Sequence, residues 1–370
     1  MAKPKQRSLY LSIAMIAAAL GLAYAPIPGT KRSVIIVSGT ELQEPLQKII
    51  LQFQQQHPEI KITLKTQGSL DMVNRFIDDK NDFQPTVLIP ANGELLKDLE
   101  TRWQTQNNSA AFYGTPIPIA KTRLVAIAWT ERGQALFPDG KFRWERIEQA
   151  MKAQSWGSVS GGTAAWGSFD FKMTDPTRSN SGQVTLGLWL ESKLKQSTLS
   201  SADLNTPAAQ SLVSLVKRSV YQPPRSSDIL LQEFVAKGAN EADIATDYES
   251  IALYRWAQSK TSQSKPYQIY DINPTVETVS TAAIVTRNVD EGTAKAAQTF
   301  LTELTQPTSQ SVLVQYGFRP VNPAVQIEAV AGNLWNQGIP GAQAKPSNPA
   351  VNSPSLQTLQ DIGRLWERAQ

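Results

Sequence analysis

Apolar runs typical of buried strands alternate along this chain with amphipathic stretches typical of helices. Residues 33–37 are almost continuously apolar, as in a strand covered on both faces, and the amphipathic stretch 44–56 follows. Pro45 is tolerated only in a first helical turn, so it marks where that helix starts. The same order recurs twice, with strands at 60–64 and 86–89 and helices at 72–77 and 94–103. Three such units predict an α/β domain with a mainly parallel sheet flanked by helices.

The later pattern predicts a second lobe. The apolar stretch 124–129 predicts a strand that crosses into this lobe, and the stretch 281–286 predicts a strand that returns. Helical stretches at 291–304 and 310–316 would then rejoin the first lobe. Residues 331–354 are rich in Gly, Pro, Asn and Ala and predict an irregular connector before a helix at 355–368. The expected division is a leader or anchor at 1–30, a discontinuous first lobe at 31–120 and 282–330, a second lobe at 121–281 and a C-terminal extension at 331–370.

The N-terminus predicts export. Three basic residues precede an apolar run that ends in Ala23-Tyr24-Ala25, which has the small-x-small form of a cleavage site. Pro26 opposes cleavage at that point. The alternatives are cleavage nearby or retention of residues 9–25 as an inner-membrane anchor of about 17 residues, the lower limit for a span. Either way we expect a periplasmic protein that meets the membrane only through residues 9–25.

Composition excludes several classes of site. The net charge of +4 comes largely from Lys3, Lys5 and Arg7, because the other 33 basic residues nearly balance 32 acidic ones. No basic stripe occurs elsewhere, so we expect no nucleic-acid partner. The chain has no Cys and one His, which excludes disulfides, cysteine nucleophiles and Cys/His zinc sites. We expect no metal and no cofactor.

Polar loops follow each of the first three predicted strands. Ser38-Gly39-Thr40, Ser69 and Asn92 stand at those positions, and ligands bind beyond the carboxyl ends of parallel strands. The segment 174–182 adds hydroxyls, an amide and a guanidinium before the apolar run 184–190. Unpaired N–H groups at a helix start attract anions and polar ligands. This pattern predicts a ligand-gripping loop, the alternative being a capped helix start after a turn.

Four motifs carry a resemblance to a known family. They are Val37-Ser38-Gly39-Thr40 with a helix ending in Phe53-x-x-x-His57-Pro58, the stretch from Trp166-Gly167-Ser168-Phe169 to Gly182, the segment 243–250, and Tyr316-Gly317-Phe318-Arg319-Pro320. Across roughly residues 33–325 the chain resembles bacterial extracellular solute-binding proteins of the second structural type, in the molybdate-, sulfate- and phosphate-binding superfamily. It looks most similar to the subgroup associated with von Willebrand A-type domains.

This resemblance implies two α/β lobes joined by two crossing strands, with a solute held between them by hinge closure. It implies a ligand site made of Ser38, Gly39, Thr40, Ser69, Thr174, Arg178, Ser179, Ser181, Tyr248 and Glu249, to which the position of Asn92 after the third strand adds that residue. The chain lacks the nucleophile, phosphate-loop and zinc-protease motifs of common enzymes, so we expect no catalysis. Neutral donors favour an oxyanion, although Glu249 would repel a dianion. The expected partners are the solute and an ABC-type permease or a von Willebrand A-type protein. We expect a monomer; the alternative function is a membrane-tethered sensor or interaction module.

Individual residues keep their rival interpretations. Arg178 would grip a carboxylate or oxyanion, or pair with Asp175 or another carboxylate. Glu249 would contact the ligand, or cap or pair with a nearby Arg. Trp156 and Trp166 would line the cleft, but packing is the favoured interpretation. Ser192-Lys193-Leu194-Lys195 has the Ser-x-x-Lys form without the companion motifs of penicillin-recognising enzymes.

Overall fold

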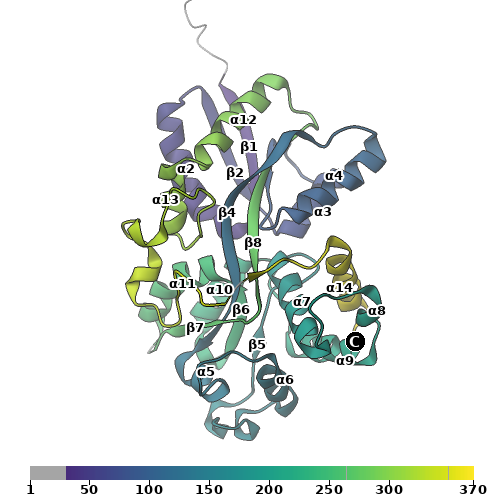
Figure 1. Cartoon of the computed structure of the whole chain (residues 1–370), viewed down its shortest axis with the longest axis vertical. Coiled ribbons are helices and arrows are strands. Elements are labelled where there is room, and N and C mark those ends of the chain that lie inside the picture. Colours follow the sequence, from purple (N-terminus) through teal and green to yellow (C-terminus); the bar gives the residue numbers. More distant parts are fainter. Residues whose placement is uncertain (1–30, 264, 349) are drawn as a thin grey trace, which may run out of the picture.

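A computed structural model describes residues 31–263, 265–348 and 350–370, so the predicted leader or anchor lies outside the described residues. Two lobes, one above the other in Figure 1, are linked by the long strands β4 (Phe112–Trp129) and β8 (Thr275–Val285). Among the described residues, no helix combines the length and the apolar character that a membrane crossing requires.

The first lobe is built on three parallel strands. β1 (Arg32–Ser38) lies between β2 (Ile60–Thr66) and β3 (Val87–Ile89), and β3 pairs antiparallel with β8. The buried core of this lobe draws on 34–120 and 282–318, so distant parts of the sequence share one interior. Its helices are η1 (Thr40–Leu42), α2 (Gln43–Gln56), α3 (Ser69–Ile77), α4 (Glu94–Asn107), α12 (Glu291–Leu304) and α13 (Pro307–Gln315).

The second lobe has a smaller sheet between two apolar cores. β6 (Ile244–Tyr248) pairs antiparallel with β4 and parallel with β5 (Phe171–Lys172), while β7 (Tyr267–Asp271) also pairs with β4. The helices of this lobe are α5 (Thr130–Leu136), α6 (Trp144–Ala153), η2 (Trp156–Ser158), η3 (Ala164–Trp166), α7 (Asn180–Leu194), α8 (Ser201–Leu204), α9 (Pro207–Ser219), α10 (Ser227–Lys237), η4 (Gly238–Asn240) and α11 (Glu249–Ser262).

The crossing strands are longer than the sequence pattern predicts. The apolar signal marks 124–129 and 281–286, whereas the strands run from Phe112 and from Thr275. Their additional residues are partly exposed and carry Pro, Thr and Gly, so a search for apolar runs misses them. β4 and β8 pair antiparallel along most of this length, which places one hydrogen-bonded ladder at the junction of the lobes.

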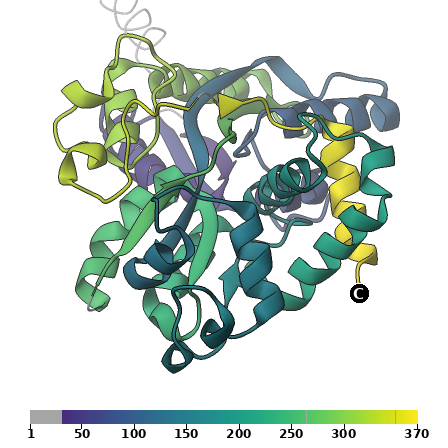
Figure 2. The ribbon, with the colours of Figure 1, turned by 60° about the horizontal axis from the view of Figure 1, so that its bottom comes forward.

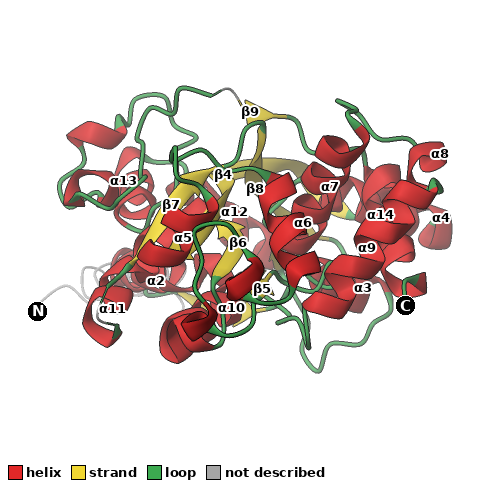
Figure 3. Ribbon diagram, turned by 90° about the horizontal axis from the view of Figure 1, so that it is seen from below, coloured by secondary structure: helices red, strands yellow, loops and turns green. Residues whose placement is uncertain are grey.

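The C-terminal extension crosses from one lobe to the other. η5 (Ile327–Ala329) and η6 (Leu334–Gln337) precede β9 (Ala350–Val351), which pairs with β8, and α14 (Leu356–Arg368) follows. α14 packs against α7, α8 and α9 of the second lobe and reaches α4 of the first (Figures 2 and 3). The irregular connector and the terminal helix agree with the sequence pattern.

Candidate functional site

The loops after β1 and β2 lie against the second lobe along a contact that we call the seam. On the second lobe it comprises 174–181, Ser226–Ser227 and the end of β6. At Gly68 an added Cβ would lie 2.6 Å from the carbonyl oxygen of Arg178 and 2.9 Å from that of Arg225. The N–H of Leu70 donates to the same Arg178 carbonyl at 3.3 Å. Backbone therefore touches backbone across the seam, and the two lobes are closed upon each other.

Four hydroxyl residues form a buried network on the second-lobe side. Ser181 Oγ lies 2.7 Å from Thr174 Oγ1, 3.2 Å from Ser179 Oγ and 3.0 Å from Ser227 Oγ. The sequence pattern placed the helix after Gly182, but α7 begins at Asn180 and takes Ser181 into its first turn. Three hydroxyls predicted from the sequence are thus brought together, and they satisfy one another.

Two further predicted residues join a chain of contacts across the lobes. Asn180 Nδ2 donates to the Tyr248 hydroxyl at 2.8 Å, and Asn92 Nδ2 of the first lobe contacts Asn180 Oδ1 at 3.4 Å and Ser353 Oγ at 3.2 Å. Burial is the main cause that raises the pKa of Tyr248 well above its ordinary value, and the nearby Glu41 carboxylate raises it further. Tyr248 therefore acts as a neutral hydroxyl at the seam.

The first-lobe hydroxyls Ser38 and Ser69 hydrogen-bond within the first lobe, Ser38 in its own loop and Ser69 to the loop after β3. Ser38 Oγ donates to the Gly39 carbonyl at 3.0 Å, and Ser69 Oγ accepts from the Ala91 N–H at the same distance. Both residues are buried. Thr40 is half-buried, and its Oγ1 has no hydrogen-bond partner within the described chain.

Arg178 and Glu249, the charged residues of the predicted site, both have protein partners. Asp71 Oδ2 on α3 accepts from Arg178 Nη2 at 2.6 Å and Nε at 2.9 Å, so this pair links the lobes. Asp175, the partner named in the sequence-based alternative, instead accepts from Thr177. Glu249 holds Arg319 in a fork of 2.7 and 2.8 Å.

Sequence reasoning missed two carboxyls at the seam, Glu41 and Asp247. Both are buried, and Glu41 Oε1 and Asp247 Oδ2 have no hydrogen-bond partner among the described residues. Burial raises the pKa of each to about 7, and the Glu41 charge raises that of Asp247 further. Their positions in the sequence could have indicated both residues, because Glu41 directly follows Ser38-Gly39-Thr40 and Asp247 directly precedes Tyr248.

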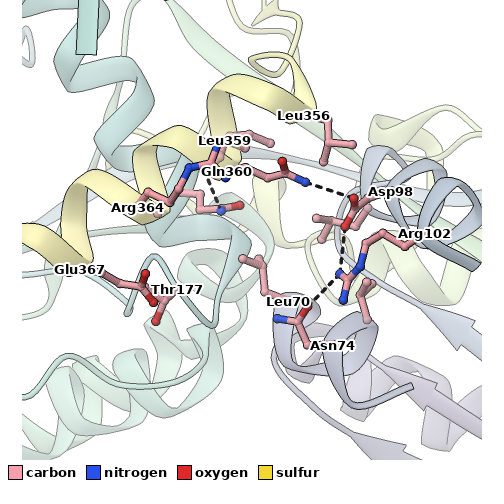
Figure 4. A pocket seen from close by; sticks show the side chains of 14 residues that line it. Leu70, Asn74, Asp98, Arg102, Thr177, Leu356, Leu359, Gln360, Arg364 and Glu367 are labelled. Atoms are coloured by element: carbon pink, nitrogen blue, oxygen red, sulfur yellow. Dashed lines mark hydrogen bonds and ion pairs between the residues drawn. The ribbon is translucent and has the colours of Figure 1, made fainter. Parts of the chain in front are cut away.

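Small openings flank the closed centre of the seam. On one side a cavity of about 10 Å³ is bordered by Thr40, Glu41, Asp228, Tyr254 and Tyr316, together with Gln43, Glu44, Pro45 and Ile251. On the other, a cavity of about 240 Å³ opens between α3 and α4 of the first lobe and α14 of the second (Figure 4). There Asp98 accepts from Gln360 of α14 and from Arg102 of its own helix.

The cleft tryptophans considered from the sequence serve packing. Trp156 is completely buried, and Trp166 packs edge-on against it with ring centroids 5.1 Å apart. The guanidinium of Arg132 lies 3.9 Å from the centroid of Trp166. This arrangement belongs to the core of the second lobe rather than to the seam.

A family model described as "Bacterial extracellular solute-binding protein" matches residues 34–319. The chain belongs to this family. The match covers both crossing strands and every residue of the predicted ligand site. Members of this family are extracellular solute-binding proteins, and the family consists of binding proteins rather than enzymes. Among curated proteins, none matches the chain by sequence.

Solved structures share its fold at low sequence identity. "Periplasmic thiamin binding protein" is 12% identical with a TM-score of 0.62, over 91% of this chain and 95% of that one. The sulfate-binding protein SubI from Mycobacterium tuberculosis H37Rv is 18% identical with a TM-score of 0.55, over 84% and 92%. A ferric binding protein from Campylobacter jejuni is 12% identical with a TM-score of 0.54, over 90% and 96%. These neighbours confirm the α/β fold of type II periplasmic binding proteins that the sequence predicted.

The polar side chains of the seam offer hydrogen bonding. Within the described ranges, no group of three or more His, Cys, Asp or Glu side chains is arranged to hold a metal ion. Its chemistry comes from hydroxyls, an amide, two carboxyls that each have one oxygen without a partner in the described chain, and helix starts, a set suited to reversible capture of a polar molecule.

Proposed function

We propose that this chain captures a small polar solute at the seam by closure of its lobes and delivers it to an ABC-type importer. The proposed lobes are 31–120 with 282–330, and 121–281, with 331–370 as an extension. One observation carries the proposal: seam groups from both lobes are buried, yet several of their polar atoms have no hydrogen-bond partner within the described chain. Buried polar groups are normally satisfied, so such atoms are the expected contacts of a bound solute.

Some features of the seam favour binding of the oxyanion expected from the sequence, and others oppose it. The hydroxyls and the first turns of α3 and α7 favour an anion. Opposed to it, the Leu70 N–H at the start of α3 is taken by the Arg178 carbonyl, and Arg178 is neutralised by Asp71. The fold does not indicate the class of solute, since its structural neighbours are named for sulfate, thiamin and iron binding. The von Willebrand A-type partner stays a prediction from the sequence.

Thermal unfolding against a panel of oxyanions, organic cations, amino acids and sugars tests solute capture. A solute at about 100 times its dissociation constant should stabilise the native state by about 2.7 kcal/mol. Ser181→Ala should reduce that gain, because Ser181 is the centre of the hydroxyl network. Ser192→Ala, at the far end of the same helix, is the matched control. No stabilisation by any member of the panel would count against solute capture.

Gly68→Ala tests whether capture requires closure. The backbone of Gly68, with φ of −59°, suits alanine, so the substitution acts through the collision of its Cβ with the opposite lobe. If closed molecules fall to about one in a hundred, the apparent affinity falls about 100-fold. Small-angle scattering should then show a larger radius of gyration. Gly363→Ala on α14 is the control, since its nearest neighbour would be 3.9 Å away. Unchanged affinity in Gly68→Ala would refute closure as the mechanism.

A further inference from the structure

Two buried carboxyls face the seam from opposite lobes. Glu41 belongs to η1 of the first lobe and is 6% exposed; Asp247 is the penultimate residue of β6 in the second and is fully buried. One oxygen of each, Glu41 Oε1 and Asp247 Oδ2, has no hydrogen-bond partner in the described chain. The other oxygen of Asp247, Oδ1, accepts from the Tyr248 N–H at 2.8 Å. A buried carboxylate oxygen without a partner is costly, so its retention calls for a compensating group.

The elements that carry the two carboxyls both pack against α10. η1 carries Glu41 and β6 carries Asp247, and the Glu41 charge raises the pKa of both Asp247 and Tyr248. The absence of a side chain at Gly39 leaves room for the Glu41 carboxyl, since an added Cβ there would collide with it. Two hydroxyls on the flanking segments, Thr40 Oγ1 and Ser226 Oγ, also have no partner among the described residues.

Three arginines around the seam have carboxylate partners, whereas Arg225, whose carbonyl borders Gly68, is exposed and forms no salt bridge within the described residues. Arg178 pairs with Asp71, Arg255 with Asp228 and Arg319 with Glu249. No salt bridge within the described residues reaches Glu41 or Asp247. An anion placed between them would be repelled by two carboxylates at low effective dielectric, whereas a cation would be attracted.

We propose that the solute carries a protonated nitrogen that binds between Glu41 and Asp247, which makes the cargo a small organic cation. This inference rests on the proposed function and specifies the class of solute. An ammonium group offers three donors, so it satisfies both free carboxylate oxygens by charge-assisted hydrogen bonds and leaves a donor for a hydroxyl.

The small cavity beside Glu41 has room for such a head group on the Glu41 side; Asp247 is not among its lining residues. Its volume of about 10 Å³ suits a water-sized group, and an ammonium head is of that size. Tyr254 and Tyr316 border the same cavity, with ring centroids 5.1 Å apart. Each ring already has a protein cation near its face, with Arg255 5.4 Å from the centroid of Tyr254 and Lys48 5.8 Å from that of Tyr316, so the rings border the cavity without being counted as contacts of the nitrogen.

Calorimetry on the purified full-length protein at pH 8 and fixed ionic strength tests the charge of the solute. The probes are methylammonium and putrescine, their uncharged analogues methanol and 1,4-butanediol, and the anions sulfate and molybdate. We expect binding of an ammonium probe at least tenfold tighter than that of its uncharged analogue. Sulfate or molybdate binding in preference to the ammonium probes would overturn this inference while supporting solute capture.

Variants then locate the bound nitrogen. Glu41→Gln and Asp247→Asn keep the shape of each side chain, and each should weaken ammonium binding at least tenfold. Glu145→Gln on the exposed surface of α6 makes the same change in net charge and should leave binding intact. Equal affinity in the first two variants and the control would overturn the inference.

The pH dependence of the wild type supplies a test without substitution. Ammonium binding requires both carboxyls ionised, and the pKa of each is about 7, so affinity should rise about 100-fold between pH 6 and pH 8. The other groups facing this region are Glu44 of α2, Asp228 of α10, Tyr248 of β6, Tyr254 and Arg255 of α11, and Tyr316 after α13. A flat profile for an ammonium probe would overturn the inference; no binding of any probe would count against solute capture itself.

Discussion

Two buried glutamates, Glu249 and Glu41, show opposite electrostatic arrangements. Glu249 at the start of α11 receives two hydrogen bonds from Arg319 and a third from Trp335 Nε1 at 3.2 Å. Glu41 in η1 is equally buried, but its Oε1 has no partner within the described part of the chain. A buried carboxylate with a complete set of donors holds structure together, whereas one without them is available to a ligand.

The largest expected effect comes from removing the partner of Glu249. Arg319→Met should destabilise the protein by about 3–5 kcal/mol, because it leaves a buried charge without compensation. It also removes donors to the carbonyls of Ala344 and Gln343 in the extension. Chemical denaturation measures the loss, with the exposed Arg146→Met of α6 as control. An effect no larger than that of the control would mean that this pair is not structural, and the contrast with Glu41 would disappear.

Removing the charge of Glu41 should stabilise the protein, whereas removing Arg319 destabilises it. Burial raises the pKa of Glu41 from 4.5 to about 7, so the folded state binds a proton more tightly than the unfolded state. Its contribution to stability is therefore lost as pH rises from about 4.5 through about 7. Glu41→Gln should be more stable than the wild type at pH 8, by about 3 kcal/mol at most, and nearly equal to it at pH 4. Unfolding curves at both pH values check this; destabilisation at pH 8 would contradict an uncompensated charge.

The smallest expected effect concerns the pair that bridges the lobes. Arg178 and Asp71 are 29% and 24% exposed at their side chains, so solvent screens their attraction. Asp71→Asn should weaken closure by about 1 kcal/mol, or roughly fivefold in solute affinity. Asp78→Asn, which breaks an exposed pair with Lys80 within the first lobe, is the control. If both substitutions change affinity equally, the bridging pair has no special part in closure.

The order of secondary structure followed well from the hydrophobic pattern. Predicted helices such as 44–56 and 291–304 agree with α2 and α12 to within one residue, because amphipathic periodicity extends through their whole length. The pattern failed where polar residues enter an element, as at Asn180 and Ser181 in the first turn of α7. There the backbone becomes helical before the apolar run starts.

The site was harder to predict because charge compensation depends on residues distant in sequence. Glu249 and Arg319 are 70 positions apart, and Arg178 meets Asp71 across 107. The alternatives stated from the sequence included pairing for both Arg178 and Glu249, but not these partners. Glu41 and Asp247 adjoin predicted site residues, yet nothing local shows that their oxygen atoms lack donors. The lack of hydrogen-bond donors around these oxygen atoms can be seen only in the three-dimensional structure.

The C-terminal extension adds a third connection between lobes that the two crossing strands already join. Ser353 bonds Asn92 of the first lobe, and Gln360 of α14 bonds Asp98, while α14 stays packed on the second lobe. Separating the lobes must break these bonds or peel α14 from its helices. If solute capture proceeds by lobe closure as we propose, these contacts would oppose opening, and the rate of solute release would depend on a segment that need not touch the solute.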